Sequence, residues 1–175
     1  MSKWNRPCRL KKVEVKIKLY DGIMPQKQHT GDAAFDLYVP RDTELKTGRQ
    51  VIDLGFALSL AHGFAALVQP RSGFSSKGIE VWYKKDEGQG GSFASDPHYR
   101  LDADVIVGLV DENYRGHVGA IVNVKRPIAE NERIVIGKGV RIAQLRIVEV
   151  PQAEFVEVEA LDDTERKSGF GSTGT

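Results

Sequence analysis

The chain of 175 residues has very little cysteine, and its charges almost cancel. Cys8 is the only cysteine, so no disulfide can form within the chain. The 25 Lys and Arg residues against 24 Asp and Glu residues leave a formal net charge of +1, which gives no indication of binding to nucleic acid or to an anionic membrane. Any site for an anion must therefore be local.

Long apolar runs are missing as well. No stretch approaches the roughly 18 apolar residues that a membrane-spanning helix needs, and the start of the chain lacks the apolar segment of a signal peptide, so we expect a cytoplasmic protein. There is no Gly-x-x-x-x-Gly-Lys-Ser/Thr loop and no dinucleotide-binding fingerprint. The four histidines are dispersed, so a metal site built from protein ligands alone is not expected.

Short β-like segments follow one another along the chain, with turn residues between them. Residues 13–20 alternate apolar and polar side chains, which is typical of a strand with one buried face. Similar segments lie at 35–39, 51–60, 64–69, 105–110, 117–124, 132–136, 141–150 and 155–159. No window of a dozen residues shows a capped helical pattern. The sequence therefore predicts one all-β domain, a sandwich or barrel of short strands.

The C-terminus is rich in Gly, Ser and Thr but carries one aromatic residue. Phe170 stands between two glycines and could stack on a flat ring, and Arg166 supplies a positive charge nearby. Hydroxyls and amides that suit phosphate oxygens come from Gly171, Ser172 and Thr173. These groups together suit a nucleotide, and the alternative is an untethered tail.

Two upstream segments carry further candidate groups. Arg71, Ser72 and Gly73 follow an apolar run and place a guanidinium, a hydroxyl and a flexible amide where phosphate could bind, although an ordinary polar turn is the alternative. Asp111 ends an apolar strand before a polar turn that contains Tyr114. Its carboxylate could accept a proton from water, but Asp also initiates turns for purely structural reasons.

Two polar side chains lie within the apolar segment 141–150. Arg141 and Gln144 are three residues apart, so the strand period predicts that they face opposite sides. A buried polar group without a partner costs about 1–3 kcal/mol, so at least one of the two needs a ligand or a structural hydrogen-bond network. Asp36 starts another β-like segment and has no interpretation by itself.

Taken in order, these segments resemble the five motifs of the trimeric dUTPase family, the dUTP nucleotidohydrolases, from about residue 13 to residue 174. The segments close to the family's form include 108–116, 141–145, 161–166 and 169–174. The resemblance implies a jelly-roll-like β fold that assembles as a homotrimer with three active sites at subunit interfaces. Residues 1–162 would form the β domain, and residues 163–175 would form a flexible lid over the nucleotide.

The resemblance also implies an activity: hydrolysis of dUTP to dUMP and pyrophosphate, which limits uracil in DNA and supplies dUMP. Asp111 would orient and deprotonate the water that attacks the α-phosphorus, and Gln144 would help to hold the water or a phosphate. Tyr114 would pack under the deoxyribose, the backbone after Asp111 would read uracil, and Phe170 would stack on it. The implied phosphate ligands are Arg71, Ser72, Gly73, Arg166, Gly171, Ser172 and Thr173.

Mg²⁺ is the implied cofactor. The triphosphate would hold it mainly, because Mg²⁺ keeps several waters and uses few protein ligands. Asp36 resembles a carboxylate that lies near the water shell of the metal. The chain departs from the family pattern in places: Ala34 stands where a Gly is usual, and the spacing from Arg166 to Phe170 is one residue shorter.

Residues 83–99 lack periodicity and mix charges with Gly and Ser, which predicts a long exposed loop inserted in the domain. Loops longer than about 12–15 residues are usually functional or disordered. Most members of the family have a short connection here, but some bacteriophage members carry an insert that can contact other proteins. The loop is therefore either an arm for a protein partner or a tolerated insertion.

Two alternatives compete with dUTP hydrolysis. The dCTP deaminases share the fold and have similar second and third motifs, but they need a catalytic Glu ten residues after the Asp of the third motif. In this chain the position ten residues after Asp111 is Ile121, whose side chain cannot transfer a proton. The second alternative is a regulatory module that binds nucleotide without hydrolysing it. The presence of Asp111, Gln144 and the C-terminal motif favours the enzyme.

Overall fold

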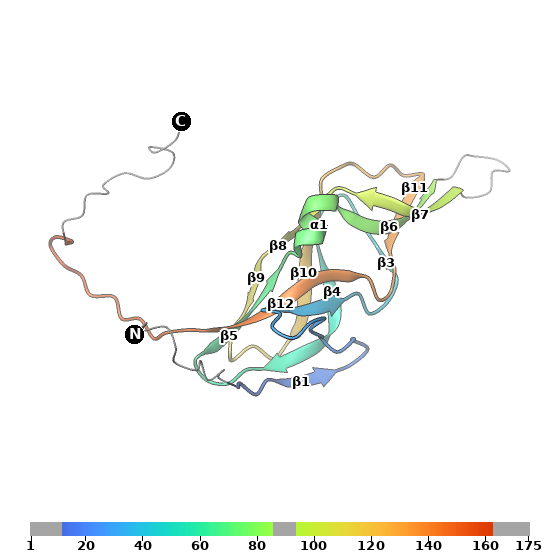
Figure 1. Ribbon diagram of the computed structural model, residues 1–175. Helices are drawn as coiled ribbons and strands as arrows, with labels where there is room; N and C mark the ends of the chain where they lie inside the picture. Colours follow the sequence, from blue (N-terminus) through green and yellow to red (C-terminus); the bar gives the residue numbers. More distant parts are fainter. Residues whose placement is uncertain (1–11, 86–93, 163–175) are drawn as a thin grey trace, which may run out of the picture.

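A computed structural model describes residues 12–85 and 94–162, which form an almost entirely antiparallel β structure (Figure 1). Its strands are β1 (Lys16–Leu19), β2 (Phe35–Tyr38), β3 (Thr43–Glu44), β4 (Gly48–Ser59), β5 (Phe64–Gln69), β6 (Ile79–Lys85), β7 (Ala94–Leu101), β8 (Ala103–Ile106), β9 (Gly108–Val110), β10 (His117–Val124), β11 (Glu132–Ile136) and β12 (Arg141–Glu149). One short helix, α1 (Ser72–Lys77), lies between β5 and β6. The predicted all-β fold is confirmed.

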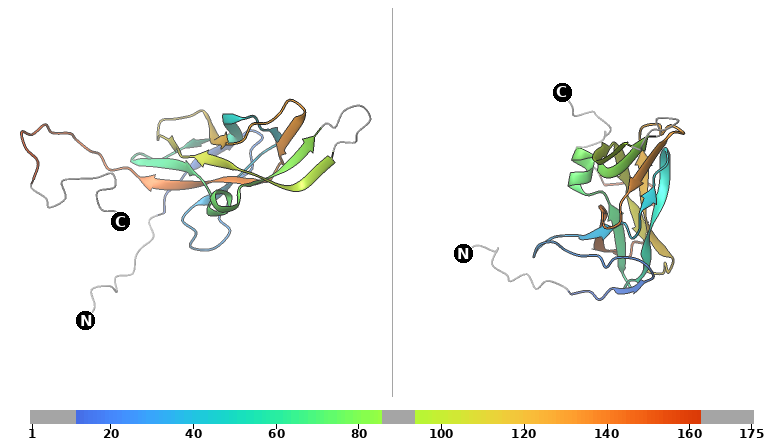
Figure 2. Two further views of the ribbon diagram at one scale, coloured as in Figure 1. Left: turned by 90° about the horizontal axis from the view of Figure 1, so that it is seen from above. Right: turned by 90° about the vertical axis from the view of Figure 1, so that its right-hand side faces the viewer.

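The strands form three four-stranded sheets that enclose one core. Their orders are β1-β4-β10-β8, β3-β11-β6-β7 and β2-β12-β5-β9. The burial of β10 alternates strictly along its length, as expected for a strand with one face in the core. Leu37, Leu54, Ile134 and Ile142 come from four different strands and all three sheets, and all are fully buried. Figure 2 shows the sheets packed against one another in two further views.

Most predicted strands are present, but two predictions need correction. Residues 105–110 do not form one strand: the chain breaks at Val107, so that β8 pairs with β10 while β9 pairs with β5 in a different sheet. Residues 155–159 are not a strand, because no strand in the described chain pairs with them. Residues 150–162 instead form an extended arm that leaves the sheets (Figure 1), and Phe155 on it is 99% exposed.

The prediction of a long exposed loop at residues 83–99 is wrong at both ends. Residues 83–85 belong to β6 and residues 94–99 belong to β7, and the two strands pair as a hairpin. The tip at 86–93 lies outside the described residues. The apolar residues that alternate from Ile79 onward give a strand signal, but this signal merges with the Gly-rich stretch, so the sequence does not show where the strand ends.

A network of polar and aromatic side chains fixes the base of this hairpin. The rings of Tyr83 and Tyr99 stack with their centroids 5.0 Å apart. The Tyr83 hydroxyl donates to Glu132 Oε1 at 2.8 Å, and Arg126 donates to the Tyr99 hydroxyl at 3.0 Å and to Glu132 Oε2 at 2.9 Å. The base of the hairpin is therefore an ordered part of the domain.

The sequence does not predict the helix α1, because six residues are too few to show a helical period. It buries Phe74 and ends at Gly78, whose φ of +72° and close approach to Leu101 O leave no room for a side chain. Nowhere in the described ranges is a helix long and apolar enough to cross a membrane.

Candidate active site

The carboxylate of Asp36 holds two arginines that come from distant parts of the chain. Arg71, directly before α1, donates from Nε to Asp36 Oδ1 at 2.7 Å, and Arg141, at the start of β12, donates from Nη1 to Asp36 Oδ2 at 3.3 Å. Asp36 itself is only 8% exposed. A buried carboxylate needs such partners, because an unpaired buried charge is strongly destabilising. Asp36 therefore fixes both guanidinium groups at one place.

These residues line a polar cavity of about 560 Å³ together with Gln144. The Gln144 side-chain amide donates to Pro70 O at 2.8 Å, which holds it beside the start of α1. The prediction that Arg141 and Gln144 face opposite sides is wrong. A register shift between Arg141 and Ala143 interrupts the alternation of β12, so both side chains line the same cavity.

The predicted phosphate ligands of the second segment do not all lie in this cavity. Ser72 lines it, but Gly73 lines a neighbouring cavity of about 500 Å³ that also contacts Arg71. The first-turn amides of α1 have no partners within the helix and could bind an anion. Two further hydroxyls are engaged within the helix, since Ser75 donates to Arg71 O and Ser76 to Gly73 O.

Asp111 lies in a different part of the molecule, directly after β9. Its side chain is exposed, and it lines a cavity of about 490 Å³ with residues 62–65 and with the first residues of the arm. Tyr114 caps the turn, because its hydroxyl donates to His117 O at 3.0 Å and its ring covers Gly116. A Cβ at Gly116 would lie 2.6 Å from Tyr114 Cζ, so a larger residue at this position would displace the exposed Tyr114 ring.

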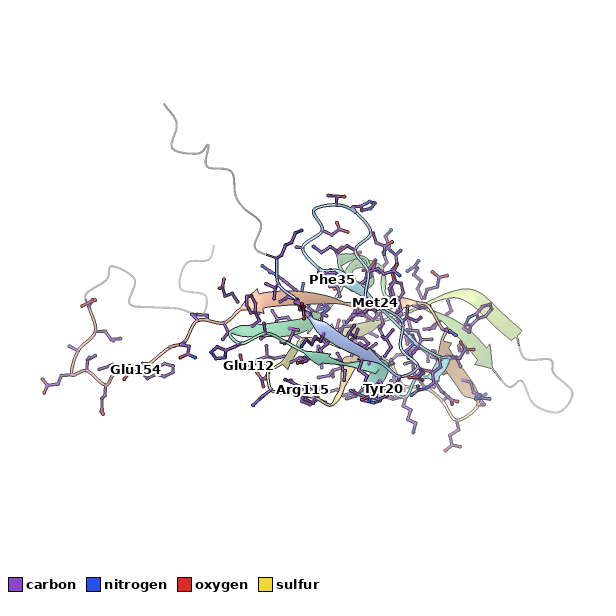
Figure 3. All side chains as sticks on the ribbon, turned by 90° about the horizontal axis from the view of Figure 1, so that it is seen from below. Tyr20, Met24, Phe35, Glu112, Arg115 and Glu154 are labelled. Atoms are coloured by element: carbon purple, nitrogen blue, oxygen red, sulfur yellow. The ribbon has the colours of Figure 1, made fainter. Side chains whose placement is uncertain are left out.

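Within one chain, the two groups stand at opposite ends of β5. Val110 pairs with Ala66, which places Asp111 next to Ala65, whereas Gln144 pairs with Gln69. The four steps from residue 65 to residue 69 span roughly 13 Å of strand. Figure 3 labels Glu112, which follows Asp111, and Phe35, which precedes Asp36, at separate places on the molecule. A single chain therefore does not bring Asp111 to the Asp36 cavity.

Several of the predicted site residues lie outside the described residues. They are the five members of the C-terminal motif: Arg166, Phe170, Gly171, Ser172 and Thr173. Ile121 is described, and it lies on β10 between Val51 of β4 and Ile106 of β8. The residue at the position expected for the Glu of a deaminase is thus aliphatic and sits among aliphatic neighbours in the sheet.

The described ranges contain no group of three or more Asp, Glu, His or Cys residues placed to hold a metal ion. Each Asp36 oxygen accepts a hydrogen bond from an arginine and keeps a second lone pair, which could accept a hydrogen bond from a water molecule bound to a metal. Carboxylate and water oxygens are the ligands that Mg²⁺ prefers. The arrangement fits a Mg²⁺ ion that arrives with a triphosphate and meets Asp36 through water.

Sequence reasoning missed other residues of the Asp36 cavity. Arg146 lies two residues after Gln144 on β12 and adds a third arginine, and Gln69 ends β5 directly before Pro70. The period of a strand could have identified Arg146, since residues two apart share a face. The cavity is also lined by five residues of the loop before β2: Gln28, His29, Asp32, Ala33 and Ala34.

A family model and curated relatives that match this chain all carry the name of one enzyme family. The family model described as dUTPase matches residues 21–87 and 99–174. Two relatives carry the name deoxyuridine 5'-triphosphate nucleotidohydrolase. The one from Corynebacterium glutamicum is 35% identical, with 86% of this chain and 87% of the relative covered. The one from Nautilia profundicola is 34% identical, with 93% and 99% covered.

Solved structures of phage enzymes share the fold. A point mutant of the Staphylococcus phage 80alpha dUTPase has a TM-score of 0.69 at 26% identity, covering 91% of this chain and 98% of that one. The dUTPase of the same phage with dUPNHPP has a TM-score of 0.68 at 27% identity, covering 93% and 99%. A phage phi11 dUTPase mutant, whose structure addresses a structural Mg(II) ion, has a TM-score of 0.63 at 21% identity, covering 84% and 97%. From the extent of the family match and the identity to the bacterial relatives, this chain belongs to the dUTPase family.

Proposed function

We propose that this chain hydrolyses dUTP to dUMP and pyrophosphate. Its relatives are named for this reaction, and the phage 80alpha enzyme was solved with the dUTP analogue dUPNHPP. The observation that carries the proposal is the cavity in which Asp36 orders Arg71 and Arg141 beside Gln144. Guanidinium groups held in this way suit the oxygens of a triphosphate. The deaminase alternative is not favoured, because Ile121 cannot transfer a proton.

The cavity would bind the phosphates. Arg71 and Arg146 supply positive charge, Ser72 supplies a hydroxyl, and Gln144 keeps its carbonyl oxygen for the attacking water or an amide hydrogen for phosphate. Mg²⁺ bound to the triphosphate would neutralise its charge, and Asp36 would meet the ion through water. Orientation and charge neutralisation are the main requirements of phosphoryl chemistry.

Asp111 would act as the general base. Its carboxylate is exposed and makes no hydrogen bond in the described part of the chain, so it is free to take a proton from water. Tyr114, which is 45% exposed, stands on the same turn, where a deoxyribose could pack against its ring. The C-terminal motif would close over the nucleotide, with Phe170 on the uracil.

The distance between Asp111 and the cavity supports a site shared between subunits of a homotrimer. If the two groups act on one nucleotide, a second subunit must bring its Asp111 to the Asp36 cavity of the first. Apolar side chains on the surface of the single chain also support assembly: Val51 is 69%, Val107 56% and Leu109 61% exposed. Side chains of this kind are often covered by a partner.

Mixed trimers test both the function and the assembly. Asp111→Asn subunits would be co-expressed with Arg71→Ala subunits carrying a different affinity tag, and mixed trimers would be purified through both tags. If each site takes Arg71 from one subunit and Asp111 from another, every mixed trimer contains one intact site and has about a third of the wild-type activity. Pyrophosphate release from dUTP is the measurement, with dCTP, dTTP and UTP as controls.

The mixed trimers remain inactive if both groups act within one chain, because every site then carries one of the two substitutions. That result would reject the shared site but not the hydrolysis. Wild-type protein that releases no pyrophosphate from dUTP would reject the hydrolysis itself. Ammonia release from dCTP would instead favour the deaminase.

A further inference from the structure

The position of the Asp111 carboxylate depends on its turn, because this carboxylate has no hydrogen bond or ion pair of its own within residues 12–85 and 94–162. The turn is closed by backbone and side-chain contacts. Tyr114 N donates to Asp111 O at 3.1 Å, and Arg115 Nη1 donates to Glu112 O at 2.6 Å. Figure 3 shows Glu112 and Arg115 in this region of the molecule.

Glu112 attaches this turn to the turn between β4 and β5. Its Oε2 accepts a hydrogen bond from Gly63 N at 2.6 Å, and its Oε1 lies 3.0 Å from His62 Nδ1. The hydrogen bond from His62, followed by that from the Gly63 amide, lowers the pKa of Glu112 below its ordinary value, and the charge of Arg115 acts in the same direction. Glu112 is therefore an anion that uses both carboxylate oxygens to hold the neighbouring turn.

Gly63, in the turn between β4 and β5, forms hydrogen bonds to two other segments of the chain. Its amide is bound to Glu112, and its carbonyl oxygen accepts a hydrogen bond from Val150 N at 2.8 Å, at the point where β12 ends and the C-terminal arm begins. Gly63 has a φ of +79°, a conformation that residues with side chains rarely adopt. The Asp111 turn, the β4–β5 turn and the root of the arm are thus tied together by two hydrogen bonds to one residue.

We propose that Glu112 is a positioning residue for the hydrolysis: through its bond to Gly63 it holds the turn that presents Asp111 to the attacking water. The inference rests on the proposed function, because it assigns Glu112 a task in the same reaction. Glu112 touches neither substrate nor water in this role. A general base that moves by about 1 Å can lose about 100-fold in rate, so a fixed turn matters more for turnover than for binding.

The bond to Gly63, rather than the contact with His62, should carry the effect. The side chain of His62 is 79% exposed, and exposed ion pairs contribute little. The hydrogen bond from Gly63 N is shorter and partly buried. A neutral amide at position 112 could still accept that hydrogen bond. Glu112→Gln should therefore keep its activity, which it would lose if Glu112 acted as a general base.

The test compares three variants, Glu112→Ala, Glu112→Gln and His62→Ala, with the control Glu44→Ala. The control removes an exposed carboxylate on β3 that pairs with Arg133 of β11. We expect kcat for dUTP to fall about 10- to 100-fold in Glu112→Ala with KM changed less than about twofold. Glu112→Gln, His62→Ala and the control should stay near wild type, and Glu112→Gln should keep the wild-type pH profile. Thermal unfolding and trimer mass are recorded for every variant.

Two results would overturn the proposal. The first is a Glu112→Ala protein with wild-type kcat, and the second is a Glu112→Gln protein as impaired as Glu112→Ala, which would assign the charge itself a role. If Glu112→Ala does not fold, Glu112→Asp serves instead, since its shorter side chain cannot reach both turns; a wild-type kcat there would again reject the proposal. Activity of the wild-type protein on dUTP tests the proposed function separately.

Discussion

Arg71 Nε lies 2.7 Å from Asp36 Oδ1, so a carboxylate from β2 determines where the guanidinium at the start of α1 points. The same carboxylate accepts a hydrogen bond from Arg141 at 3.3 Å. Three segments that are far apart in the sequence thus meet at one buried charge. The cavity owes its positive groups to this arrangement, because unpaired arginine side chains would rotate freely in solvent.

Replacing Asp36 by Asn should therefore weaken both the fold and the binding of nucleotide. The amide keeps the shape but loses the charge that pairs with the two arginines, and we expect the free energy of unfolding to fall by about 1–3 kcal/mol. KM for dUTP should rise roughly tenfold, the equivalent of about 1.4 kcal/mol. Urea unfolding and steady-state kinetics measure the two effects.

The matched control for this experiment is Asp104→Asn, because Asp104 pairs with Lys125 on an exposed part of the sheet. It should change neither quantity measurably. If Asp36→Asn behaves like this control, Asp36 does not organise the cavity.

Asp111→Asn should separate binding from turnover. The amide cannot accept a proton from water, and loss of a general base typically costs about 10²- to 10⁴-fold in rate. The turn should persist, since its hydrogen bond uses the backbone oxygen of Asp111. Calorimetric titration with dUPNHPP should then give nearly wild-type affinity while pyrophosphate release is lost. A variant with normal turnover would show that another group is the base.

The sequence predicts some strands to the residue. The β-like segment at 117–124 becomes β10 and the apolar run at 64–69 becomes β5, each with the predicted bounds, whereas the alternation at 13–20 becomes the shorter β1. The sequence does not predict the short helix α1 or the strands β3, β6 and β7. A six-residue helix buries only Phe74 and shows no period, and β6 runs directly into the Gly-rich stretch.

Candidate site residues could be named from the sequence, but their arrangement could not. The resemblance to the family selects Asp36, Asp111 and Gln144, yet it does not show that Asp111 lies at the other end of β5, because strand register and subunit contacts are tertiary properties. The register shift before Ala143 reverses the predicted facing of Arg141. Local irregularities of this kind are common near functional sites and leave no clear signal in a single sequence.

Deleting residues 168–175 should reduce catalysis while sparing the fold. The resemblance assigns Phe170 and its neighbours to closure over the nucleotide, and closure excludes water and completes the site. We expect kcat/KM to fall by about 100-fold or more, with an unchanged melting temperature, because the buried core of the described domain is built without these residues. Removal of Thr175 alone is the control. An active truncated protein would mean that the C-terminal motif is not the lid.

Glu132→Gln should loosen the base of the β6–β7 hairpin. The hydrogen bond from Arg126, followed by those from Ala129 N and the Tyr83 hydroxyl, lowers the pKa of Glu132 from its ordinary 4.5 to about 2. A carboxyl group with a lowered pKa in the folded state stabilises the fold above pH 4.5, and this contribution is lost as the pH falls toward 2. The variant should therefore be less stable than wild type at pH 7, and the difference should shrink at about pH 3.

Urea unfolding at the two pH values measures this difference, and amide hydrogen exchange of β6 and β7 locates it. Glu130→Gln is the control, because Glu130 is exposed on the neighbouring loop. The hairpin amides should exchange faster in Glu132→Gln than in the control, since Tyr83, which stacks on Tyr99, loses the carboxylate that joins it to Arg126. A stability difference that stays constant between the two pH values would show that the charge of Glu132 does not anchor the hairpin.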